Sequence, residues 1–157
     1  MKRLFRPLIF LCLLMLFALP LSACAGLGDY DIRLAGDYEI WRMSGWNRQI
    51  VLRVSETGAN PVIGSYIDKV AFDNEYICAQ KLEVDARESP PVNENSARSY
   101  YVIVVESGEV LGPMTEAEFN DWYAALGRTD TPLWFDAGDE HALHDSWEEL
   151  NPGQSYE

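Results

Sequence analysis

Residues 100–105 read Tyr-Tyr-Val-Ile-Val-Val, and the expected fold is built around this run. Aromatic and β-branched side chains favour strands over helices. The run is apolar on both of its faces, which is typical of a strand that is buried on both sides. It therefore predicts a central strand of a sheet that is covered on both faces.

Shorter strand-like segments lie on both sides of this run. Each is apolar-rich and is bounded by turn residues, so the pattern is that of several short strands at regular spacing. Residues 85–97 are almost wholly polar and predict an exposed loop. The predicted strands are 38–43, 49–54, 62–66, 67–72, 76–84 and 110–111, with a last short strand or hook at 133–135.

One helix is predicted directly after these strands, from Thr115 to Leu126. Thr115 and Glu118 have the spacing of a capping box, and Met114 can pack on Phe119 across the cap. An apolar stripe follows at helical spacing and is expected to pack on the sheet, and Gly127 is placed to end the helix. The stripe consists of Phe119, Trp122, Tyr123 and Leu126.

These elements predict an α+β fold, a mainly antiparallel sheet of about five or six short strands with one helix packed on a face. We expect one domain over residues 37–135. Residues 24–36 are small and polar and predict a tether, and the acidic residues 136–157 predict a loose tail.

The N-terminal segment has the order of a secretion signal. Three basic residues precede an apolar stretch of about 12 residues, short of the roughly 20 that a membrane-spanning helix needs. The stretch ends in Leu-Ser-Ala-Cys at residues 21–24, which resembles the lipobox of bacterial lipoprotein precursors. We expect residues 1–23 to be a cleaved signal peptide and Cys24 to carry lipid, palmitate included.

Lipidation predicts a location in the bacterial cell envelope. The protein would be anchored on the outer face of the cytoplasmic membrane or, in a Gram-negative host, on the outer membrane facing the periplasm. Ala25 favours the outer membrane in that host, because an Asp at this position would resemble an inner-membrane retention signal.

Signal removal also changes the charge and the cysteine content. It leaves 9 basic and 25 acidic side chains, a formal charge of about −16 in place of −13. Such a charge disfavours nucleic acid as a partner and attracts a basic protein. Cys78 becomes the only cysteine of the folded part, so no disulfide forms there, and its apolar neighbours predict a buried, inert thiol.

No catalytic motif is found in the sequence, so we expect a protein that is not an enzyme and needs no cofactor. His141 and His144 lie near Asp139, Glu140 and Asp145, a set of donors that zinc could accept. Because histidines often lie among acids without a metal, we expect no metal site.

Two tryptophans in predicted loops are candidate contact residues for a partner. Trp46 lies in a turn and Trp134 lies before the acidic tail. A tryptophan in a loop buries a large area on docking, and the alternative for both is packing onto the core of their own domain.

Several short segments, taken with the lipobox, resemble a family of small bacterial lipoproteins that carry a domain of unknown function. The resemblance covers residues 1–127 and implies no activity, binding residue or cofactor. The segments are residues 26–30, 37–42, 71–77, 100–103 and 112–119.

Together these features predict a membrane-tethered, noncatalytic binding lipoprotein. Its partner would be a basic envelope protein, and an immunity or inhibitor protein is the sharper form of this hypothesis. The alternative is a structural or envelope-maintenance lipoprotein with no discrete ligand.

Overall fold

The computed structural model describes residues 29–45, 47–84, 96–128 and 130–154. The predicted signal peptide, Cys24, Trp46 and most of the predicted loop at 85–97 lie outside the described residues.

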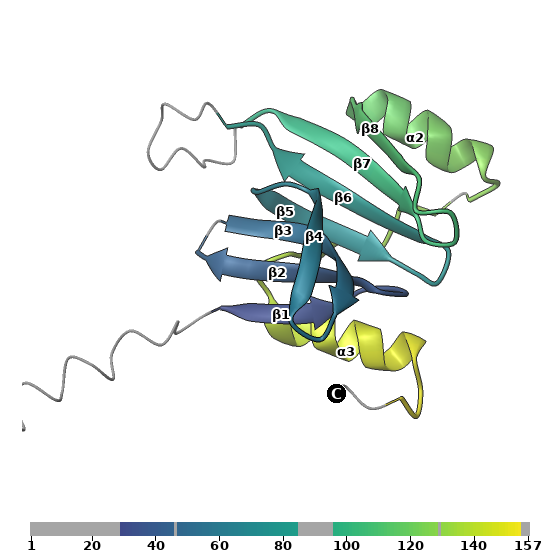
Figure 1. Ribbon diagram of the computed structural model, residues 1–157. Helices are drawn as coiled ribbons and strands as arrows, with labels where there is room; N and C mark the ends of the chain where they lie inside the picture. Colours follow the sequence, from purple (N-terminus) through teal and green to yellow (C-terminus); the bar gives the residue numbers. More distant parts are fainter. Residues whose placement is uncertain (1–28, 46, 85–95, 129, 155–157) are drawn as a thin grey trace, which may run out of the picture.

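The described strands form two antiparallel sheets (Figure 1). The first sheet has the order β1 (Tyr30–Arg33), β2 (Tyr38–Ser44), β3 (Asn47–Ser55) and β4 (Gly58–Ile63). The second has the order β8 (Val110–Met114), β7 (Arg98–Val104), β6 (Tyr76–Leu82), β5 (Ile67–Phe72) and β9 (Phe135–Asp136).

Strand β7 is buried on both faces, as its sequence predicts. Ile103 is 0% exposed and lies in the core between the two sheets. Tyr100 and Val102 point to the opposite face, where they pack with Phe119 of helix α2 (Glu116–Ala125). The second sheet is thus the middle layer of the fold, between the first sheet and α2.

Helix α2 begins and ends as predicted. Thr115 is its N-cap, and both hydrogen bonds of the capping box with Glu118 are present. Gly127 follows the helix with a φ of 75°, a left-handed conformation that glycine adopts without a steric penalty.

The apolar stripe of α2 is only partly core. Phe119 is 1% exposed, and Trp122 and Tyr123 are half-buried against the same cluster. Leu126 is 38% exposed, so the prediction that the whole stripe packs on the sheet is wrong at its last position. The reason is that Leu126 is the C-cap of the helix and not part of its last regular turn.

The prediction of one sheet is too coarse, because the chain leaves the first sheet after β4 and begins the second at β5. Tyr66, in this connection, has a φ of 76°, which non-glycine residues adopt only rarely. Strand β4 also lies earlier in the chain than predicted, and it includes Pro61. Proline has no backbone N–H to donate, and an edge strand such as β4 tolerates this because one of its sides has no neighbouring strand.

A second helix, α3 (Glu140–Leu150), replaces the predicted loose tail. Leu143 and Trp147 are 0% and 3% exposed, and α3 contacts the edge strands β1 and β9 (Figure 1). It closes the side of the sandwich on which these two strands end the sheets. The expectation of a loose tail is therefore wrong for residues 136–151, because burial of two large apolar side chains holds this segment in place.

Strand β1 likewise lies within the predicted tether. Ile32 and Leu34 are 2% and 1% exposed and belong to the core between the sheets. The folded part thus begins at least as early as Tyr30, ahead of the predicted boundary at residue 37.

Among the described residues, neither helix is long and apolar enough to cross a membrane.

Candidate functional site

A cleft of about 520 Å³ lies on the outer side of the second sheet, between the ends of α2 and α3. Strands β5 and β6 form its floor, and the segment that leads to β9 forms one wall. This volume is in the range of small-molecule and side-chain binding pockets. The lining of the cleft includes Asp73, Tyr76, Cys78, Tyr123, Arg128 and Leu133.

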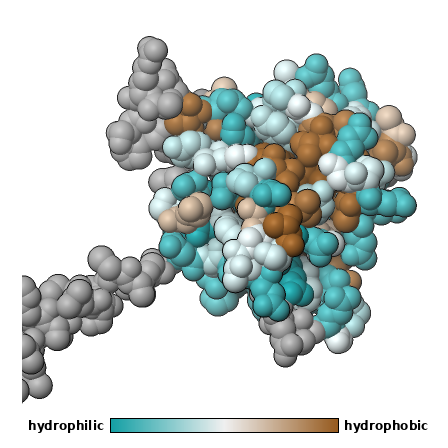
Figure 2. All heavy atoms as spheres, in the orientation of Figure 1, coloured by the Kyte–Doolittle hydropathy of each residue, from teal (hydrophilic) through white to brown (hydrophobic). Residues whose placement is uncertain are grey.

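Leu133 gives the cleft an exposed apolar wall. It is 74% exposed, more than any other large apolar side chain of the described chain. Figure 2 shows an apolar patch in the middle of the face seen in Figure 1, with hydrophilic residues around it. The other large apolar side chains that are exposed are Met43, Val54, Val110 and Leu126.

Cys78 lies on the floor of the cleft as a buried free thiol, which confirms the predicted burial. Burial, with a smaller effect of the Asp73 charge, raises the pKa of Cys78 to about 12. The thiol is therefore protonated at neutral pH and is a poor nucleophile, since the thiolate is the reactive form.

Arg128 lies at the rim of the cleft, inside a cluster of two carboxylates and two aromatic rings. Its guanidinium donates hydrogen bonds to Asp73 and, over 3.1 Å, to Glu75. The same group lies 5.1 Å from the ring centroid of Tyr76 and 5.8 Å from that of Tyr123, within the distance of a cation–π contact. The turn before β6 and the end of α2 meet at this one cation.

The hydrogen bonds of this cluster hold Asp73 ionised. Burial raises the pKa of Asp73, but the hydrogen bonds from Arg128 and from the backbone amides of Glu75 and Tyr76 outweigh it, so the pKa lies below its usual value. Hydrogen bonding to Asp73 is also the main reason that the pKa of Arg128 is raised. Both groups keep their charge across the physiological pH range.

A second cluster of this kind lies on the first sheet and differs in its exposure. Arg53 donates to Glu39 over 2.8 Å and to Asp31 over 3.0 Å, and the indole of Trp41 donates to Glu39 over 2.7 Å. The Glu39 side chain is only 4% exposed, whereas that of Glu75 beside Arg128 is 72% exposed. The first-sheet cluster thus has one buried carboxylate, Glu39, beside the partly exposed Arg53 and the exposed Asp31, whereas neither carboxylate beside Arg128 is fully buried.

Trp134, one of the two predicted contact residues, is half-buried beneath α2. Its ring centroid lies 5.7 Å from that of Phe119 and 6.2 Å from that of Tyr100. This is the local packing that the sequence left open as the alternative, and a docking role for Trp134 stays a prediction. Trp46 lies outside the described residues.

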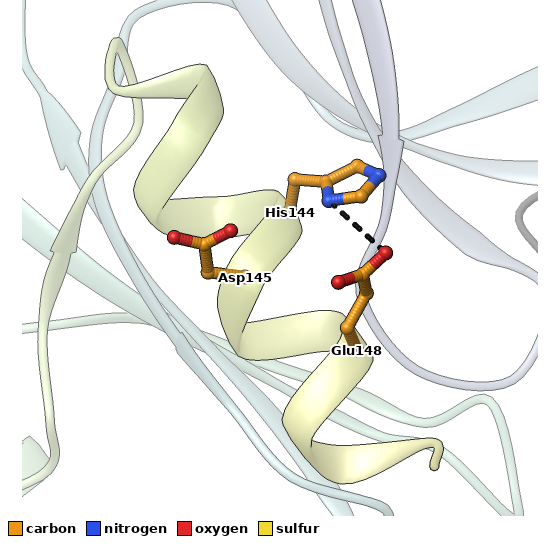
Figure 3. A group of neighbouring side chains, drawn as sticks. All are labelled: His144, Asp145 and Glu148. Atoms are coloured by element: carbon orange, nitrogen blue, oxygen red, sulfur yellow. Dashed lines mark ion pairs between the residues drawn. The ribbon is translucent and has the colours of Figure 1, made fainter. Parts of the chain in front are cut away.

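Helix α3 brings together a different set of side chains from the one that the sequence singled out around His141 and His144. Nearest ligand atoms of His144, Asp145 and Glu148 lie within 4.8 Å of one another, and His144 Nδ1 is 3.6 Å from Glu148 (Figure 3). His141 is exposed and lines a different hollow, beside Arg48. The group in Figure 3 is exposed on one helix, where acidic side chains and a histidine commonly lie together without a metal.

A scan of known families matches residues 35–127 to a protein of unknown function, DUF3997. The chain belongs to this family. The DUF3997 match includes β2 to β8 and α2, while β1, β9 and α3 lie outside it. The comparisons with curated proteins and with solved structures give no match.

The cleft therefore combines the DUF3997 domain with residues that follow it. Tyr123 and the floor belong to the matched residues, and Arg128 and Leu133 lie beyond them. The sequence did not predict this site, because Arg128 is separated from Asp73 by 55 positions. One feature of the sequence could have drawn attention to this site, because Arg128 is the only Lys or Arg between residues 99 and 157.

Proposed function

We propose that the protein is a membrane-tethered, noncatalytic binding lipoprotein of the bacterial cell envelope. Its acidic domain binds a basic envelope protein, and an immunity or inhibitor protein that blocks a basic toxin or wall hydrolase is the sharper form of this proposal. Lipid on Cys24 holds it at the membrane, on the outer face of the cytoplasmic membrane or on the periplasmic face of an outer membrane.

The observation that carries this proposal is the chemistry of the cleft. Its walls offer aromatic rings and the exposed Leu133, which suit the burial of a partner's side chain. Among the described residues that line it, the thiol is protonated, and Asp73 is held as a carboxylate by Arg128. Such a set favours binding over nucleophilic or acid–base catalysis, which needs a base beside a nucleophile.

Charge supports a basic partner. Residues 129–157 contain eight acidic side chains and no Lys or Arg, and part of this segment, α3, forms one end of the cleft. A negative surface speeds association with a cationic protein and opposes an anionic one.

The test is affinity capture from envelope extract with the wild-type protein and two variants. Leu133→Ser removes the exposed apolar wall of the cleft. Val54→Ser is the matched control, because Val54 is 58% exposed on the first sheet and does not line the cleft. We expect one stoichiometric basic partner, released by salt, that Leu133→Ser loses and Val54→Ser keeps.

Two outcomes contradict the proposal. Captures that are reproducibly empty favour the alternative, a structural or envelope-maintenance lipoprotein with no discrete ligand. Equal capture by both variants would remove the cleft as the binding site.

The tether has its own test. Cells that express the protein are fed a labelled palmitate precursor, and Cys24→Ser is compared with the wild type. Label on the wild type alone, together with its fractionation to the membrane, supports the anchor. Label on both proteins, or on neither, would contradict a lipid anchor on Cys24.

A further inference from the structure

The cluster around Arg128 has the composition of a binding site for a planar cation. A guanidinium pairs with carboxylates through its N–H groups and stacks on aromatic faces. Asp73 and Glu75 supply the carboxylates, and Tyr76 and Tyr123 supply the rings. We call these four side chains the cation cage.

The group inside the cage comes from outside the family domain. Arg128 is the first residue after the matched segment 35–127, while all four members of the cage lie within that segment. The side chain of Arg128 is 30% exposed, and that of Glu75 is 72% exposed, so one side of the cage is reached directly from solvent. The bound guanidinium can therefore be exchanged without opening the core.

The cleft continues from the cage toward Leu133 and the end of α3. A side chain that entered the cage would leave the rest of its segment against this apolar wall. Two carboxylates line the cleft, Asp73 and Glu149, against the single Arg128, so the cleft is complementary to a cationic occupant.

We propose that the cation cage is a binding site for an arginine side chain of a partner, and that Arg128 occupies it in cis as a competitor. An intramolecular group acts at a high effective concentration, so a free arginine cannot displace it. A partner displaces it because the rest of its segment gains contacts along the cleft. The use of the cage by a partner rests on the proposed function, and the cage itself rests on the geometry.

The experiment uses the full chain as the host processes it, purified in a neutral detergent. N-acetyl-arginine amide, which carries a guanidinium and no carboxylate, is titrated into the wild type, Arg128→Ala, and Arg128→Ala combined with Asp73→Asn. N-acetyl-citrulline amide is the matched neutral probe. Binding is followed by calorimetry, and the midpoint of thermal unfolding is recorded for each protein with and without each probe.

We expect Arg128→Ala to bind the arginine probe at least about tenfold more tightly than the wild type, because the competitor is gone. The added Asp73→Asn change removes this gain, and the citrulline probe shows none. If the emptied cage lowers the unfolding midpoint of Arg128→Ala, the arginine probe restores part of it and the citrulline probe does not.

Equal binding of both probes, or no gain in binding or midpoint over the wild type, would show that Arg128 is a structural clamp only. The titration contains no partner protein, so it is separate from the capture experiment. A positive titration with empty captures keeps the cage and removes the proposed function. A captured partner together with a negative titration supports the proposed function and contradicts the cation cage as a binding site.

Discussion

Helix α2 and helix α3 differ in their position in the fold and in how clearly the sequence predicts them. Helix α2 has a full capping box and lies on the outer face of the second sheet. Helix α3 has an N-cap, Asp139, without a capping box, yet Leu143 belongs to the core between the sheets. Local signals show that a helix forms, but burial decides how much of the fold depends on it.

The two helices also differ in their relation to the family domain. The DUF3997 match contains α2 and ends before β9 and α3. The main core nevertheless includes Ala137 and Leu143, which lie after the match. The comparison therefore predicts that the matched segment is not a complete folding unit in this chain.

The strongest test is truncation after Trp134, which removes β9 and α3. This change uncovers the core on the side that α3 closes, and we expect a loss of more than about 5 kcal/mol, comparable to the whole stability of a small domain. Near-ultraviolet circular dichroism should show no cooperative thermal transition. Truncation after Asn151 is the control, because the described residues that it removes are exposed. A cooperative transition in the chain that ends at Trp134 would show that the fold does not need β9 and α3.

A smaller test exchanges one tryptophan in each helix. Trp147→Ala in α3 should cost about 3 to 5 kcal/mol in the free energy of unfolding, because the side chain is buried, and Trp122→Ala in α2 about 2 kcal/mol, because the side chain is half-buried. Urea unfolding measures both values. Equal losses would show that α2 contributes to stability as much as α3.

The N-caps provide the next test. Asp139 accepts a hydrogen bond from the Ala142 amide over 3.1 Å, and Asp139→Ala should cost about 1 kcal/mol. Thr115→Ala should cost about half of that, because Glu118 still accepts from the backbone amide of residue 115. Both losses are measured by urea unfolding, and a larger loss at Thr115 would contradict the greater role of α3.

The smallest effect is expected at the end of α2, where Asp73 pairs with Arg128. The pKa of Asp73 is lowered on folding, so its contribution is complete above its ordinary value of 3.8 and is lost as the pH falls through the lower, folded value. Asp73→Asn should cost less than about 0.5 kcal/mol at pH 7, since the pair is partly exposed, and should approach no cost near pH 2. Urea unfolding at both pH values checks this, and a cost that does not change with pH would exclude the ion pair as its source.

Much of the local structure follows from the sequence. Strand β5 has the predicted bounds, Ile67–Phe72, and the cap of α2 is at Thr115. These elements are decided by hydrogen bonds and side-chain contacts between near neighbours, which the residue pattern encodes.

The misses have two different causes. Strand β1 has four residues, of which only Ile32 is buried, so its alternation is too short to recognise. Helix α3 did have a signal, since Leu143 and Trp147 are four residues apart on one face, but the many acids around them favoured the prediction of a loose tail. The charges of α3 face water and do not oppose the burial of this pair.

The candidate site is the part of the molecule that depends most on tertiary structure. The residue pattern is enough to place β2, β3 and β5 to β8, the buried thiol of Cys78, and the helix that carries Tyr123, because each follows from local pattern and composition. Two features cannot be read from local pattern: the division of the strands into two sheets, and the contact of Arg128 with Asp73 and Glu75. These contacts join residues 53 or more positions apart, and their partners are selected by which apolar faces bury one another, which no local pattern specifies.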